Sequence, residues 1–129
     1  MKIGDIYTYT TTVNEQNTAA ALGSGALPVF GTPFLIAMME NAAFTGLQKE
    51  LNTDKSTVGT KICISHVSPT PIGMNVCAEA EIVAISENGK MIDFAVRAFD
   101  DAGLIGEGTH QRAIITVERF MAKCEGKRG

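Results

Sequence analysis

The sequence predicts an α+β domain in which an antiparallel sheet wraps around one long central helix. Apolar residues occupy almost every side of a helical period in the stretch FGTPFLIAMMENAAFTGL (30–47), which is typical of a helix inside a fold. From Thr57 onward the pattern changes to alternation, in four segments separated by short turns. Because one sheet is the only element available to cover the helix, we expect the sheet to curl about the helix.

The first strand and the helix are bounded by recognisable local signals. Residues 3–13 are rich in β-branched and aromatic side chains and are expected to form a strand. The small and polar residues that follow, NEQNTAAALGSGALP, predict a long loop with at most a short helical turn, of the kind that forms lids. Thr32 predicts an N-cap with Pro33 as the first helical residue, and NTDKST predicts the end of the helix near Leu51.

Four further strands complete the predicted sheet. They are expected in TKICISH, MNVCAEAEIVAI, MIDFAVRAF and LIGEGTHQRAIITVERF, followed by a basic tail, AKCEGKRG. In the first of them Ile62, Ile64 and His66 share one face. Asn88-Gly89 predicts a type I′ turn between the second and third. No internal repeat interrupts this order, so residues 1–129 are expected to form one domain.

Composition and charge exclude several classes of function. The chain has 129 residues, of which 45% are hydrophobic and 19% charged, as in a globular protein with a core of its own. A net charge of −3 offers no general surface for nucleic acid or anionic membranes. Three cysteines without CxxC spacing indicate reduced thiols, and no apolar run reaches the roughly 18 residues of a membrane span. The expected location is the cytoplasm.

Glu40 is the first candidate functional residue, because it lies in the middle of the apolar helix. A buried carboxylate without partners is costly, and desolvation raises its pKa toward the working range of a general base. A structural alternative is a carboxylate satisfied by Asn41, Thr45 or backbone donors. His66, on the strand face expected to meet the helix, could supply the partner that Glu40 lacks. His110 is expected either to be structural or to support a residue of the site.

Thr32 has two compatible interpretations. It can cap the helix, and its hydroxyl can also lie where the helix N-terminus favours a developing negative charge. Thr32 and Glu40 are eight residues apart on one helix, so their Cα atoms are about 12 Å apart. Substrate, water or His66 must therefore fill the gap between them, or the two residues that serve one site come from different chains.

Other chemistries are disfavoured. The spacing of Cys63 and His66 would suit a metal, but on a strand these side chains point to opposite faces, and no metal site is expected. The sequence contains neither a phosphate-binding glycine motif nor a GxSxG elbow.

Three segments together resemble hotdog-fold acyl-CoA thioesterases, most of all the fluoroacetyl-CoA thioesterase branch. They are TPFLIAMMENA, GTKICISHVSPTPIG and GEGTHQRAIITVERFMAK, and the similarity spans about residues 30–123. The resemblance implies that Thr32, Glu40 and His66 form the catalytic set and that Gly59 and Arg112 contact the thioester or its CoA. The branch closes its acyl pocket with an aromatic residue just upstream of the threonine. Ala26 and Leu27 occupy that region here.

The resemblance implies hydrolysis of a short-chain acyl-CoA, without a cofactor other than the CoA of the substrate. Glu40 would act as base toward water or as nucleophile, His66 would assist proton transfer and polarise the carbonyl, and Thr32 would hydrogen-bond the reacting centre. The alternative is a protein that binds acyl-CoA without turning it over. Hotdog thioesterases form dimers with sites at the subunit interface, so we expect a homodimer, or two such dimers paired in a tetramer.

Overall fold

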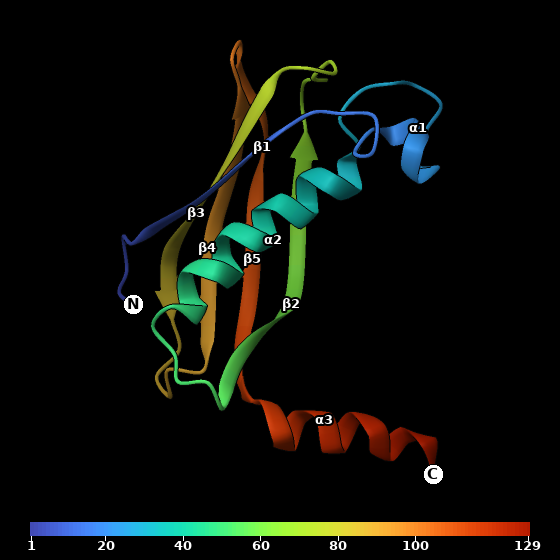
Figure 1. Ribbon diagram of the computed structural model, residues 1–129. Coiled ribbons are helices and arrows are strands. Elements are labelled where there is room, and N and C mark those ends of the chain that lie inside the picture. Colours follow the sequence, from blue (N-terminus) through green and yellow to red (C-terminus); the bar gives the residue numbers. More distant parts are fainter.

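A computed structural model describes all 129 residues, and it confirms the α+β fold class and the predicted order of strand, long helix and four strands. The elements are β1 (Ile6–Thr12), α1 (Ala19–Leu22), α2 (Thr32–Gln48), β2 (Lys55–His66), β3 (Asn75–Ile85), β4 (Met91–Asp100), β5 (Gly103–Thr116), α3 (Val117–Glu125) and a 3-10 turn, Gly126–Arg128. The five strands form one antiparallel sheet in the order β1-β3-β4-β5-β2. Figure 1 shows α2 crossing one face of this sheet and α3 extending away beyond the end of β5. None of the helices combines the length and apolar character needed to cross a membrane.

The core lies between α2 and the sheet. Six residues of α2 are buried against alternating residues of β3 and β4, as the period-two pattern predicted. The buried residues of α2 are Leu35, Met38, Met39, Ala42, Ala43 and Leu47. The opposite side of α2 is not enclosed: Ala37 is exposed, and Phe34, Ile36 and Phe44 are half-buried. A single chain therefore leaves this side of the helix uncovered, because one sheet covers only one side of a helix.

The ends of α2 differ from the prediction. Gly31, not Thr32, is the N-cap, and Thr32 and Pro33 are the first two helical residues. The Thr32 hydroxyl makes no capping hydrogen bond, since it reaches a side chain of β2 instead. The helix ends at Gln48, with Lys49 as C-cap, rather than near Leu51.

A β-bulge in β2 determines which of its residues meet α2. The register with β5 shifts between Gly59 and Lys61, so that Gly59 pairs with Arg112 while Lys61 pairs with Gln111. An extra residue in one strand reverses the alternation beyond it. Gly59 on one side of the bulge and His66 on the other thus face the same way, although a regular strand would place them on opposite faces.

The C-terminal segment forms a helix where the sequence had suggested the end of a strand and a basic tail. β5 ends at Thr116, which pairs with Lys55, the first residue of β2, so no partner strand remains beyond it. The next residues, VERFMAKCE, consist largely of good helix formers and begin α3 at Val117.

The hairpin between β3 and β4 also differs from the prediction. A type I′ turn needs positive φ at both central residues, but among non-glycine residues none has positive φ. Within this turn Gly89 alone has positive φ, at 73°, and its N–H donates to the carbonyl of Ser86.

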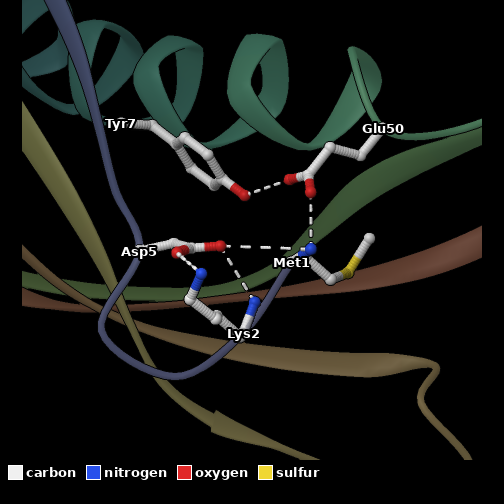
Figure 2. Close-up of polar contacts among 5 residues, drawn as sticks. All are labelled: Met1, Lys2, Asp5, Tyr7 and Glu50. Carbon is white, nitrogen blue, oxygen red and sulfur yellow. Dashed lines mark hydrogen bonds and ion pairs between the residues drawn. The ribbon is translucent and has the colours of Figure 1, made fainter.

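The N-terminal strand is tied to the end of α2 by one aromatic ring and one carboxylate. The ring of Tyr7 lies directly over Gly46, and its hydroxyl donates to Glu50 (Figure 2). The Met1 ammonium also donates to Glu50, at 2.5 Å. Burial raises the pKa of Tyr7, and its bond to Glu50 adds to this effect. The hydrogen bonds from Met1 and Tyr7 lower the pKa of Glu50.

Gly46→Ala is expected to destabilise the protein, although Ala is favoured over Gly inside a helix by about 1 kcal/mol. The added Cβ would lie 2.1 Å from Cγ of Tyr7, so the ring must move and β1 with it. Such overpacking costs about 1–3 kcal/mol. Thermal denaturation should show a lower Tm, while Gly126→Ala, whose Cβ would meet nothing within 4 Å, should leave Tm unchanged. A higher Tm for the Gly46 variant would show that this contact does not constrain β1.

Candidate active site

Thr32 and His66 form a hydrogen-bonded pair at the N-terminus of α2. Thr32 Oγ1 lies 2.7 Å from His66 Nδ1, which joins the first residue of α2 to the last residue of β2. The other ring nitrogen, His66 Nε2, is buried and has no hydrogen-bond partner. Burial lowers the pKa of His66, and the backbone of Ser68 offsets part of this effect. The imidazole is therefore neutral at pH 7, with Nδ1 hydrogen-bonded to Thr32 and Nε2 without a hydrogen-bond partner.

A cavity of about 330 Å³ opens beside this pair. It is bounded by the loop that the sequence predicted as a lid, which contains α1, and by the residues that follow β2. The lining residues are Ala19, Ser24, Val29, Phe30, Thr32, His66, Val67, Ser68 and Pro69. Ala26 and Leu27 are not among them, and Leu27 is 64% exposed.

Glu40 lies two turns further along α2 and is less buried than the sequence predicted. Its side chain is 40% exposed, and Oε2 lies 3.6 Å from Nη1 of Arg112. A Cβ placed on Gly59 would come within 2.6 Å of the same oxygen, so a side chain at this position would displace the carboxylate from where it lies. The expected partnership of Glu40 with His66 is absent, because His66 is bonded to Thr32 and Glu40 pairs with Arg112.

Arg112 is held by a set of contacts that use most of its donors. The residue is 6% exposed. Its Nε and Nη2 donate to the hydroxyl and carbonyl of Thr57, at 2.8 and 3.1 Å, and its guanidinium lies 5.8 Å from the ring centroid of Phe44. Burial lowers the pKa of Arg112, and Glu40 raises it. Arg112 therefore supplies a fixed positive charge beside Glu40.

The tautomer of His110 follows from its neighbours. Nη1 of Arg112 lies 3.1 Å from His110 Nε2, and a guanidinium can only donate, so Nε2 accepts. The proton is then on Nδ1, which donates to the carbonyl of Lys61 at 2.8 Å. Burial lowers the pKa of His110, which keeps the ring neutral. His110 thus orients Arg112, in agreement with the structural role expected for it.

The predicted site residues fall into two groups on the same face of the sheet. Thr32 and His66 form one, and Glu40, Gly59 and Arg112 form the other. At about 1.5 Å per residue, the Cα atoms of Thr32 and Glu40 lie about 12 Å apart. The structure therefore brings the residues together in two clusters but does not join the clusters within one chain.

Two residues of this region have surroundings that the sequence did not indicate. Thr57 positions Arg112, and its place two residues before Gly59 on one strand would have put it on the same face. The Asn41 side-chain oxygen is buried without a partner and lines a cavity of about 190 Å³ beside β1. The place of Asn41 in an apolar helix does not predict this cavity, because the cavity is formed by packing against β1, a strand distant in sequence.

The five-stranded antiparallel sheet packed on one long helix, with polar groups along the face between them, defines a hotdog-fold protein of the thioesterase superfamily. A family model described as "Fluoroacetyl-CoA-specific thioesterase" matches residues 13–118. This chain belongs to that family.

Individual relatives agree with this assignment. The fluoroacetyl-CoA thioesterase of Streptantibioticus cattleyicolor is 32% identical, over 98% of this chain and 94% of its own length. A crystal structure of a point mutant of the fluoroacetyl-CoA-specific thioesterase FlK superposes with a TM-score of 0.91, at 32% identity over 98% of this chain and 97% of that one. A thioesterase superfamily member from Thermus thermophilus, at 22% identity over 98% of this chain and 94% of its own, has a TM-score of 0.85 and supports the fold alone.

Thr57→Val is expected to destabilise the protein, because it leaves the Nε–H of Arg112 buried without an acceptor. Losing a hydrogen bond to a charged group costs about 1.5–3 kcal/mol. Urea denaturation should show this loss in the free energy of unfolding. Thr109→Val is the matched control, since Thr109 is an exposed strand residue of β5 and should tolerate the change. Equal stability of the two variants would mean that the Thr57 hydroxyl does not hold Arg112.

Proposed function

We propose that this protein hydrolyses the thioester of a short-chain acyl-CoA, with Thr32, Glu40 and His66 as its catalytic set. The observation that carries the proposal is the Thr32–His66 pair, which leaves a buried imidazole nitrogen without a partner beside a cavity. A buried polar atom of this kind is normally satisfied, so an unsatisfied one at a cavity suits a bound ligand. The family and a related crystal structure with fluoroacetate and CoA support the substrate class.

His66 would act on the thioester carbonyl. When the Thr32 hydroxyl donates to Nδ1, the proton of the neutral ring lies on Nε2, which has no hydrogen-bond partner in the protein. Nε2–H can then donate to the carbonyl oxygen and stabilise the negative charge that develops on it as the carbonyl carbon is attacked. Thr32 would hold the ring in this orientation, and its oxygen, whose only proton is donated to Nδ1, would accept a hydrogen bond from the attacking water at the reacting centre.

Glu40 would supply the attacking group. Its carboxylate is accessible, and Arg112 and Gly59 fix its position. It can accept a proton from a water that attacks the carbonyl, or attack the carbonyl itself to form an anhydride that water then hydrolyses. In both routes the CoA thiolate leaves and takes up a proton, and the products are the free acid and CoA.

The separation of the two clusters within a chain favours a site to which two chains contribute. Within a chain about 12 Å separates Thr32 from Glu40, so we place the Glu40 cluster of one subunit against the Thr32–His66 pair of its partner. The edge strand β2 and the uncovered side of α2, including Ala37 and Phe44, are surfaces that a second copy would cover. The proposed unit is a homodimer with two equivalent sites.

The acyl group is proposed to be short and not necessarily fluorinated. In the related branch an aromatic lid residue closes the acyl pocket, and this chain has Ala26 and Leu27 in that region. Phe30 is the first aromatic residue upstream of Thr32, but it is 2% exposed and belongs to the core. Selectivity for a fluorinated group would have to come from elsewhere.

A panel of acyl-CoA substrates with a thiol-detecting assay tests the proposed reaction, and Glu40→Gln tests the mechanism. The variant is near-isosteric, so the fold should persist while kcat falls by about 100-fold or more, the effect of losing a positioned base. Glu107→Gln, a change of the same charge at an exposed position of β5, should leave kcat unchanged. A folded Glu40→Gln protein with near-normal kcat would refute the role of Glu40. Binding of acyl-CoA without release of thiol from any substrate would favour the non-catalytic alternative.

Mixed dimers test the shared site. Glu40→Gln and His66→Ala homodimers should each be inactive. When the two chains are combined, half of the dimers contain one of each, and one of the two sites in such a dimer retains both residues, so about one quarter of wild-type activity should return. If mass spectrometry shows that subunits have exchanged but no activity returns, Glu40 and His66 of one site belong to the same chain. A monomer in light scattering at micromolar concentration would exclude the shared site.

A further inference from the structure

A further cavity, of about 580 Å³, opens where α3 leaves the end of β5. Its lining consists of apolar and basic side chains with one threonine and no acidic residue. The lining residues are Leu51, Lys55, Lys90, Ile114, Ile115, Thr116, Arg119, Phe120 and Lys123. We call this cavity the basic groove.

Two of the four cations are held close together by one hydroxyl. Lys55 Nζ lies 3.5 Å from Thr116 Oγ1, and Arg119 Nη2 lies 3.3 Å from the same oxygen. None of the four basic residues of the groove takes part in an ion pair. In a chain of net charge −3, this concentration of unneutralised positive charge favours an anionic ligand with more than one charge.

The rest of the lining favours a ligand with a flat apolar part. Ile114, Ile115 and Phe120 line the same groove as the cations, and Phe120 is 40% exposed although it is aromatic. An exposed aromatic ring beside lysine and arginine side chains is suited to stack a nucleotide base while the cations contact its phosphates.

The sheet register connects the basic groove to the Glu40 cluster. Gly59 pairs with Arg112, Thr57 with Ile114 and Lys55 with Thr116. Residues two apart on a strand share a face, and the rise is about 3.4 Å per residue. Lys55 and Thr116 therefore lie about 14 Å from the Gly59–Arg112 pair on the same face of the sheet, a distance that an extended pantetheine arm can span.

We infer that the basic groove binds the 3′-phosphorylated ADP end of acyl-CoA, an inference that rests on the proposed function for the rest of the substrate. The family resemblance associated Arg112 with the substrate. However, Arg112 is 6% exposed and hydrogen-bonded to Thr57 and His110, so its positive charge acts on Glu40 rather than on a phosphate. The phosphates are assigned instead to Arg119, Lys123, Lys55 and Lys90.

Kinetics with two substrates test this assignment. The double variant Arg119→Gln/Lys123→Gln should raise KM for the best acyl-CoA roughly tenfold, the effect of losing two exposed ion pairs. Its kcat, and its KM for the matching acyl-pantetheine thioester, should not change. The double variant Lys127→Gln/Arg128→Gln makes the same charge change just beyond α3, outside the groove, and should behave as wild type. Equal effects on both substrates, or equal effects of both double variants, would overturn the assignment.

Direct binding separates this inference from the proposed reaction. Adenosine 3′,5′-bisphosphate titrated into the full-length protein by calorimetry should bind to wild type and to Lys127→Gln/Arg128→Gln, and about tenfold more weakly to the groove variant. This result would support the groove even if no thioester were hydrolysed. Absence of binding to wild type would overturn the assignment, and so would equal competition by inorganic phosphate, which would identify an anion site without nucleotide recognition.

Discussion

Burial of one side of α2 against the sheet is the constraint on which the rest of the structure depends. Six apolar side chains of the helix are enclosed, and each fully buried large side chain contributes about 1.5–3 kcal/mol relative to its exposed state. Because these residues must face the sheet, the helix cannot rotate about its axis. Its other polar positions are then fixed as well: Thr32 is directed to the end of β2, and Glu40 to the middle of the same strand.

The pairing of β2 with β5 supplies the second half of each cluster. The bulge between Gly59 and Lys61 turns His66 to the face that Gly59 occupies, and the partner strand brings His110 and Arg112 to that face. A buried guanidinium is tolerated only when its donors and its charge are satisfied. Thr57 and His110 accept its hydrogen bonds, and Glu40 supplies the opposite charge. The same contacts that make Arg112 acceptable in the interior also place its charge beside Glu40, so the stability and the chemistry of this cluster have one origin.

The uncovered side of α2 and the C-terminal helix link the fold to the proposed catalytic unit. A single chain leaves Glu40 accessible from the side of the helix that the sheet does not cover. In the proposed dimer a second copy would cover this side and bring the Thr32–His66 pair to it. The helix α3 takes no part in the core, but its position at the end of β5 gathers basic residues from β2, the β3–β4 turn and α3 around one groove.

By itself the sequence determined the fold class, the order of the elements and the identity of the main polar candidates. These follow from local periodicity and from the rarity of a carboxylate in an apolar helix, which do not depend on contacts between distant segments. The exposure of Glu40, its pairing with Arg112 instead of His66, and the shared face of Gly59 and His66 were decided by the tertiary structure. The reason is physical. A bulge reverses the alternation of a strand, which sets the orientation of His66, and a strand ends where its partner ends, which sets the start of α3. Both features depend on pairing with residues some 50 positions away in the sequence.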